Sequence, residues 1–210
     1  MLINTFYFFG ITVLSLCSFI GFGFILNNLF LIKKTNNQNI FNFFFLGLVF
    51  IIPLSFFNYL LIGNVFLINI LILITGLFFF FKNAKLVDFK INLLIVFLFF
   101  TGLLISKTHE DFSVYHFQHI KELSDGSLIF GLANLDARYF YASIYSYVQS
   151  IYKFNYFDLN LINIPIYLIY LSLVGYLFIE ISKKRKIYIC SFMILLIIFK
   201  FKRLSEFGYD

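Results

Sequence analysis

The chain has few charged residues, two prolines and no tryptophan. Charged residues make up 12% of its 210 positions and hydrophobic residues 61%, whereas a soluble domain carries about 25% charged residues. This shortage of charge excludes an ordinary soluble domain. No proline-rich linker divides the chain, so we predict one domain over residues 1–210. Phenylalanine is abundant, with 34 copies. The whole composition is biased towards Phe, Ile, Asn, Lys and Tyr, so the number of aromatic residues does not by itself indicate an aromatic-lined site.

Cysteine is also scarce, and the usual nucleotide and calcium motifs are missing. Cys17 and Cys190 each lie alone in an apolar segment, which excludes a zinc site of ordinary spacing and gives no support to a disulfide. The sequence contains no P-loop, dinucleotide-binding glycine motif, nucleophile elbow or calcium loop. A cytosolic nucleotide-driven activity therefore has no visible site, and no cofactor is identified.

The positive charge does not indicate a nucleic-acid partner. Sixteen basic and ten acidic residues give a net charge of +6, but the basic residues form short clusters between apolar runs and no continuous basic face. We therefore predict membrane lipid as a partner and no nucleic acid.

Apolar runs predict an all-α, polytopic integral membrane helical bundle. A span of about 20 apolar residues crosses the roughly 30 Å hydrocarbon core, and we predict about six transmembrane helices, at residues 6–32, 41–62, 65–81, 91–106, 159–182 and 187–199. The first run is too long for a signal-peptide core and has no preceding basic region, so it should remain in the mature protein. The Gly-Asn-Val sequence at 63–65 predicts a tight turn between the second and third helices.

Basic clusters predict the orientation of the bundle, because Lys and Arg are retained on the cytoplasmic side. Clusters at 33–34, 82–90 and 183–186 follow the first, third and fifth runs. They predict a multi-pass protein of the cytoplasmic (inner) membrane with an external N-terminus and an external loop at 107–158. The cluster at 200–203 would also be external, so either the sixth run does not fully cross or those charges have another role.

The external loop is the main polar region, and we expect juxtamembrane helices in it. A helix starting near Asp136 would place an apolar stripe along one face at three- and four-residue spacing. The stripe comprises Phe140, Ile144, Tyr147 or Val148, and Ile151. Nearby tyrosines are typical of the membrane–water boundary. This helix should lie along the outer surface with one face turned towards the bundle.

All three histidines lie in the string "HEDFSVYHFQH" at 109–119. In a helix, His109, His116 and His119 would share one face and could bind a divalent metal ion. Asp111, on another face, could act as a general base or metal ligand. The alternative is structural, because Thr108 and Asp111 fit a capping box and acids favour the first turn of a helix. In that case the acids only start a helix.

Two further strings carry charged or amide side chains. In "GLANLDAR" at 131–138, Asn134 or Asp136 could cap a helix, and Arg138 could bind a phosphate with two hydrogen bonds or instead extend towards water. The terminal string "RLSEFGYD" at 203–210 is typical of the start of another external loop. We therefore expect a truncated or split version of a longer protein.

The strings "HEDFSVYHF", "GLANLDARYFYAS" and "RLSEFGYD" resemble those of one branch of the GT-C-like membrane glycosyltransferases. The resemblance covers the chain as the N-terminal half of a longer protein. It implies transfer of a sugar from a polyprenyl-phosphate donor on the external face, in assembly of the cell envelope. By position, Asp111 would be the general base or hold a divalent cation, with Glu110 and His116 as supports.

The resemblance also implies the remaining site residues and partners. Arg138 and Arg203 would bind the donor phosphate, and Asn134 and Glu206 complete the expected substrate-binding set. The shared histidine face, and not the resemblance, gives His109 and His119 as the expected ligands of a divalent metal ion. The expected partners are a polyprenyl-phosphate-linked sugar and a second membrane chain that completes the bundle.

The alternative is a non-catalytic membrane protein, such as a transporter half, a flippase or polymerase accessory, or a structural subunit. A transporter should bury ionisable groups near the bilayer midplane. The predicted spans contain asparagines but no charged residue until Glu180, near a cytoplasmic end. This absence disfavours ion-coupled transport and leaves an accessory or structural role open, so the sequence does not decide whether the chain is an enzyme.

Overall fold

The computed structural model describes residues 2–30, 39–99, 107–108, 120–123, 134, 144–152, 159–184, 186–204 and 206–207. These residues are almost entirely helical. The named helices are α1 (Leu2–Leu29), α2 (Ile40–Leu61), α3 (Phe66–Asn83), α4 (Leu86–Phe99), α8 (Ser146–Ser150), the 3-10 helix η3 (Leu159–Asn163), α9 (Ile164–Ser182) and α10 (Ile187–Leu204). Two short strands, β1 (Lys107–Thr108) and β2 (Glu206–Phe207), form a parallel pair.

Four helices are long and apolar enough to cross a membrane. They are formed by residues Thr5–Leu29, Ile40–Leu61, Phe66–Asn83 and Leu161–Ser182. They correspond to the first, second, third and fifth predicted runs. The helices confirm the predicted all-α class, and their length and apolar composition indicate a membrane protein.

The fourth and sixth predicted runs also lie in helices, but these are not among the four long apolar ones. In α4, the described helix ends at Phe99, and residues 100–106 of the predicted run lie outside the described residues. In α10, the apolar part is Ile187–Phe199. At 1.5 Å per residue this part rises about 20 Å, short of the roughly 30 Å core. The charged residues of the 200–203 cluster continue the same helix to Leu204.

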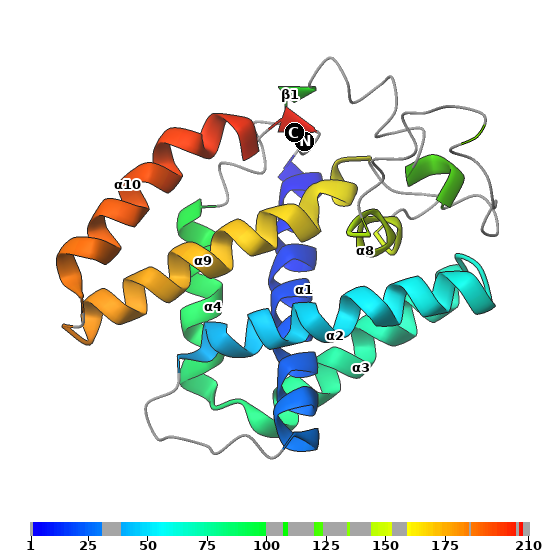
Figure 1. Ribbon diagram of the computed structural model, residues 1–210, viewed down its shortest axis with the longest axis horizontal. Coiled ribbons are helices and arrows are strands. Elements are labelled where there is room, and N and C mark those ends of the chain that lie inside the picture. Colours follow the sequence, from blue (N-terminus) through cyan, green and yellow to red (C-terminus); the bar gives the residue numbers. More distant parts are fainter. Residues whose placement is uncertain are drawn as a thin grey trace.

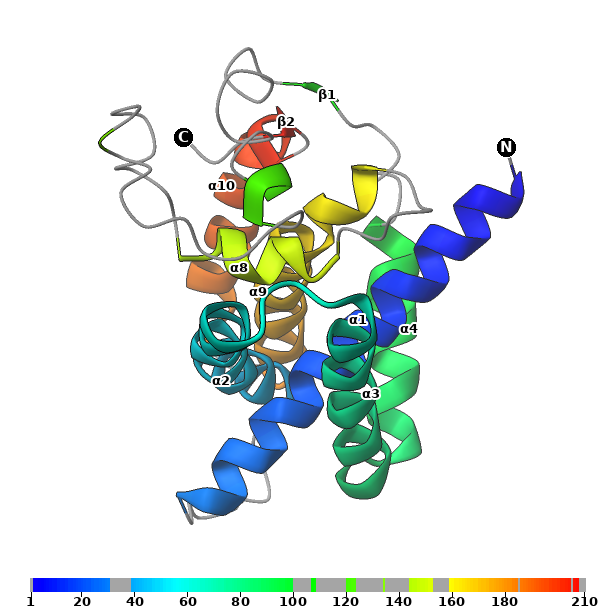
Figure 2. The ribbon, with the colours of Figure 1, turned by 90° about the vertical axis from the view of Figure 1, so that its right-hand side faces the viewer.

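Helix α1 lies at the centre of the bundle, where it packs against α2, α3, α4 and α9 (Figures 1 and 2). Its side chains include Leu16, Phe19 and Ile20, each fully buried. The Phe19 ring stacks on that of Phe44 in α2, with 5.6 Å between the ring centroids. An apolar helix buried in this way contributes mainly through close packing, because lipid is as apolar as the protein core.

Glycines allow α1 and α2 to pack through their backbones. A Cβ atom on Gly23 would lie 1.8 Å from the carbonyl oxygen of Phe43, and one on Gly47 would lie 1.9 Å from that of Phe19. Any larger residue would force the helices apart. Small residues at helix contacts are typical of membrane bundles for this reason.

The predicted turn at 63–65 is confirmed between α2 and α3. Gly63 has a φ of 82°, a left-handed conformation that glycine adopts without a steric penalty. Its backbone N–H donates to the carbonyl oxygen of Tyr59. The turn reverses the chain, and α2 and α3 then pack on different sides of α1 and not mainly on each other (Figure 2).

Polar side chains join helices at the two ends of α9. Asn39 caps α2 by accepting from the Phe41 N–H at 3.1 Å, and its amide donates to the Tyr176 carbonyl oxygen at 3.0 Å and to Glu180 Oε1 at 3.4 Å. At the other end of α9, the Tyr167 hydroxyl donates to the Phe99 carbonyl oxygen in α4. These bonds fix α9 against two other helices, so Glu180 has a structural role.

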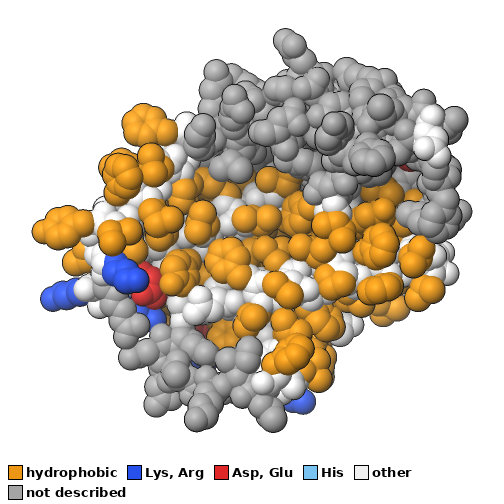
Figure 3. All heavy atoms as spheres, viewed as in Figure 1, with side chains coloured by type: hydrophobic (Ala, Val, Ile, Leu, Met, Phe, Trp, Pro, Cys, Tyr) orange, Lys and Arg blue, Asp and Glu red, His pale blue; other side chains and the backbone are white. Residues whose placement is uncertain are grey.

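Large apolar side chains cover the outer surface of the bundle. In Figure 3 they form a broad band, with basic and acidic side chains at its lower left edge. Phe78 of α3, Phe97 of α4 and Phe192 of α10 are 61%, 71% and 61% exposed. A continuous band of exposed apolar side chains is typical of a surface that contacts lipid or another protein.

The predicted juxtamembrane stripe is only partly correct. Val148 and Ile151 are buried, as expected for its inner face, but Ile144 is 52% exposed. The described helix α8 begins at Ser146, and residues 144–145 form a turn. Helical spacing therefore does not extend back to Ile144, and its side chain points elsewhere. Phe140 and the predicted start at Asp136 lie outside the described residues.

Candidate functional site

The strands β1 and β2 bring together two chain segments that are far apart in sequence. Lys107 pairs with Glu206, and Thr108 pairs with Phe207, in parallel register. One strand directly precedes the string at 109–117, and the other lies within the string at 203–210. The two residues just before the string at 109–117 are thus paired with two residues of the string at 203–210. In both views, this pair lies in the upper part of the molecule, as do α8 and the start of α9 (Figures 1 and 2).

The structure describes only some of the predicted site residues. Arg203 lies in the last turn of α10, and Glu206 lies in β2. Asn134 has a helical backbone and an exposed side chain. Six predicted residues lie outside the described residues: His109, Glu110, Asp111, His116, His119 and Arg138. Their catalytic, phosphate-binding and metal-binding roles stay predictions. The described residues contain no cluster of three or more His, Cys, Asp or Glu side chains that could hold a metal ion.

The residue just before the histidine string, Thr108, has an extended backbone. Thr108 belongs to β1, and an N-cap residue also has an extended conformation before its helix begins. The capping interpretation of Thr108 and Asp111 is therefore compatible with the strand. Residues 109–119 lie outside the described residues.

A layer of amide side chains joins the turn before α3 to α8, and α8 to η3. Asn64 Nδ2 donates to the Ser150 carbonyl oxygen at 3.2 Å, and Asn69 Nδ2 donates to Asn64 Oδ1. Gln149 Nε2 donates to the Ile162 carbonyl oxygen at 3.4 Å. Asn69 and Gln149 are each 1% exposed. Hydrogen bonds between buried amides hold this end of the bundle in one arrangement.

Glu122 is an acidic residue of this end that the predicted site omitted. It lies in the helical residues 120–123 and close enough to Tyr59 for an electrostatic interaction. The Tyr59 and Tyr147 rings pack with 5.3 Å between their centroids, and burial raises the pKa of the Tyr147 phenol. A sequence signal was present, because Glu122 falls on the same face as Asp111 if residues 111–122 form one helix. The described acid of segment 107–158 therefore lies near Tyr59, whose ring packs against that of Tyr147.

Comparison with known proteins identifies the family but assigns no activity. No curated protein and no solved structure matches the chain. One family model, described as a domain of unknown function (DUF8201), matches residues 5–207. This match covers α1 to α10 and reaches both paired strands. The chain therefore belongs to the DUF8201 family.

Proposed function

We propose that the chain is a relative of the GT-C membrane glycosyltransferases and takes part in transferring a sugar from a polyprenyl-phosphate donor outside the cytoplasmic membrane. The observation that carries the proposal is the pairing of β1 with β2. It joins the backbone that precedes "HEDFSVYHF" to the backbone of "RLSEFGYD", the two strings that contain the proposed base and a proposed phosphate ligand. A site built from these strings needs them to meet.

The chemistry of the two strings is complementary. Transfer to a hydroxyl acceptor benefits from a carboxylate that removes the acceptor proton, and the donor phosphate is best bound by a guanidinium group. Asp111 follows Thr108 by three residues, so covalent geometry keeps their Cα atoms within about 11 Å. Arg203 precedes Glu206 by the same number of residues. The strand pair therefore limits how far the acid and the arginine can lie from each other.

The proposed site requires a six-helix arrangement with the paired strands outside the membrane. In this arrangement, α4 and α10 cross beside the four longer helices, and the basic ends of α3 and α9 face the cytoplasm. In both views, the start of α1, the start of α9 and the strand pair lie in the upper part of the molecule, whereas the ends of α1 and α3 lie in the lower part (Figures 1 and 2). This separation supports the arrangement.

A non-catalytic subunit is the second candidate, and the exposed surface of α10 favours it. Tyr188 is 90% exposed and Phe199 is 82% exposed. Among the described helices, α10 packs mainly against α9. A second membrane chain could cover the remaining surface and supply the catalytic residues.

The test is the substitution Asp111→Asn in the chain within its native membrane. Transfer of radiolabelled hexose from a polyprenyl-phosphate donor should fall by about 10²–10⁴-fold, the range for losing a general base. Asp125→Asn is the matched control, because it makes the same change in the same loop, and it should leave transfer intact. Equal yields of monodisperse protein after detergent extraction exclude misfolding. Unchanged transfer by Asp111→Asn would contradict the proposed base and favour the non-catalytic subunit.

A further inference from the structure

The packing of α1 against α3 is tight around Gly21 and Gly76. A Cβ atom on Gly21 would lie 1.8 Å from the Gly76 carbonyl oxygen, so the two backbones touch there. Close by, the Ser18 hydroxyl donates to the Leu73 carbonyl oxygen at 2.9 Å. The helices are therefore fixed together at a crossing point made of small residues.

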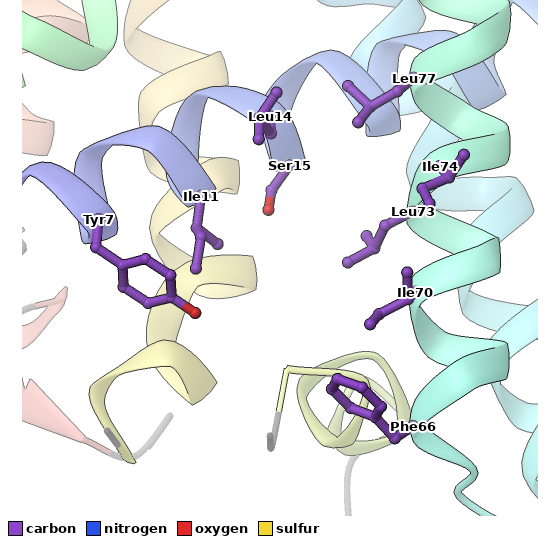
Figure 4. A pocket seen from close by; sticks show the side chains of 9 residues that line it. All are labelled: Tyr7, Ile11, Leu14, Ser15, Phe66, Ile70, Leu73, Ile74 and Leu77. Carbon is purple, nitrogen blue, oxygen red and sulfur yellow. The ribbon is translucent and has the colours of Figure 1, made fainter. Parts of the chain in front are cut away.

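The helices separate from this crossing towards their first turns and leave a groove between them (Figure 4). Tyr7 and Ile11 of α1 face Phe66 and Ile70 of α3 across the gap, and nine side chains line it in total. The cavity has a volume of about 260 Å³. The wedge shape follows from the crossing, because straight helices that touch at one point diverge away from it.

The groove opens at the outer surface of the two helices. Leu14, Phe66 and Ile74 form part of its lining and are 46%, 44% and 53% exposed. Both helices are long and apolar enough to span a membrane, so the medium at this opening is hydrocarbon. An empty groove would lose dispersion contacts along both walls. Molecules of the surrounding bilayer reach it from this side.

We propose that this groove binds one acyl chain of a bilayer phospholipid. Size argues against a protein partner, because a helix with its side chains is about 10–12 Å wide, and the cavity is smaller than the roughly 300–1,000 Å³ of sites for whole drug-sized ligands. None of the nine lining side chains is charged, so the groove offers no ion pair to a lipid phosphate. The groove therefore recognises a hydrocarbon chain by shape, and phospholipid acyl chains are the most abundant hydrocarbon chains in a bilayer. This proposal does not depend on the proposed function.

Because the chain has no tryptophan, a single introduced tryptophan reports on its own surroundings. Phe66→Trp places the reporter at the groove, and Phe78→Trp places it on the lipid-facing side of the same helix. Both proteins are reconstituted in phosphatidylcholine with brominated acyl chains, which quench tryptophan on contact. Adding Ile70→Phe fills the groove and should remove much of the quenching at Phe66→Trp. The matched change Leu71→Phe, at a 59% exposed residue outside the lining, should leave it unchanged.

A second measurement uses each single-tryptophan protein after extensive detergent exchange. Lipid phosphorus should remain at about one phospholipid per chain, in line with a single recessed site, and Ile70→Phe should lose it. Equal quenching with Ile70→Phe and Leu71→Phe overturns the proposal. Displacement by traces of polyprenyl phosphate also overturns it and assigns the groove to an isoprenoid. Quenching that falls as the protein-to-lipid ratio rises overturns it in favour of a second copy of the chain.

Discussion

Helices α1 and α3 are both apolar enough to span a membrane, yet they occupy opposite environments. In the most apolar part of α1, 67% of the residues are buried inside the protein, against 17% in that of α3. Their compositions do not explain this difference, because a phenylalanine is equally suited to lipid and to a protein core. What distinguishes α1 is that glycines and other small residues along it allow α2 and α3 to approach closely. Substitutions on the two helices should therefore differ in effect according to packing.

The largest effect is expected from Gly23→Ala in α1. The added Cβ atom would meet the Phe43 carbonyl oxygen at 1.8 Å, and such overpacking against a backbone should cost about 3 kcal/mol or more. Gly10→Ala in the same helix is the control, since nothing lies within 4 Å of its added Cβ atom. It should gain up to about 1 kcal/mol from helix propensity. Thermal unfolding in detergent, followed by circular dichroism, measures both. Similar melting temperatures for the two variants would contradict the glycine crossing.

The next largest effect is the difference in stability lost when the same substitution, Phe to Ala, is made in the core helix α1 and in the exposed helix α3. Phe19→Ala in α1 removes a fully buried ring and should cost about 3 kcal/mol, the low end of the range for buried phenylalanine, because lipid weakens the transfer contribution. Phe78→Ala in α3 removes a 61% exposed ring and should change stability by less than about 0.5 kcal/mol. Unfolding with a denaturing detergent compares them. Equal losses would show that α3 is covered by protein in the membrane.

The smallest effect concerns Tyr152, which follows α8 and lies beside α1, and it appears only at high pH. Tyr152 is fully buried, and burial raises the pKa of its phenol, with its hydroxyl beside Ser15 of α1. A folded-state pKa above the unfolded value of about 10 means that stability is full below pH 10 and is lost as the pH rises above it.

The variant Tyr152→Phe should match the unchanged protein near pH 8 and lose less stability between pH 10 and 11. Melting temperature as a function of pH measures the difference. Tyr188→Phe is the control, because this ring is 90% exposed, and it should follow the unchanged protein throughout. If Tyr152→Phe lost as much stability above pH 10 as the unchanged protein, another titrating group would control the alkaline loss of stability.

Patterns among neighbouring residues predicted the features that depend only on those residues. The long apolar runs, the all-α class and the turn at Gly63 follow from residues that are close together in the chain. Predictions that relied on helical phase across a polar segment were weaker. Ile144 was assigned to a buried stripe, but the helix starts two residues later and the side chain is exposed. Periodicity indicates a face only where the helix is continuous.

The candidate site was predictable in part. Its strings were recognisable because charged residues are rare in this chain, but their contact partners were not. Glu122 lies beside Tyr59, which is more than 60 residues away in the sequence, and no local pattern indicates such a neighbour. The groove between α1 and α3 could not be predicted either, because the sequence does not distinguish apolar side chains that line a cavity from those that face lipid.

The sequence by itself determined that this chain is a bundle of apolar helices, because a shortage of charge over runs of about 20 residues leaves the membrane as the compatible solvent. It also determined the α2–α3 turn, where only a few residues take part. The tertiary structure alone decided that α1 is the core, that Gly21 meets Gly76, and that residues 107–108 pair with 206–207. These features depend on where helices cross, and the crossing is decided by shape between segments that composition does not distinguish.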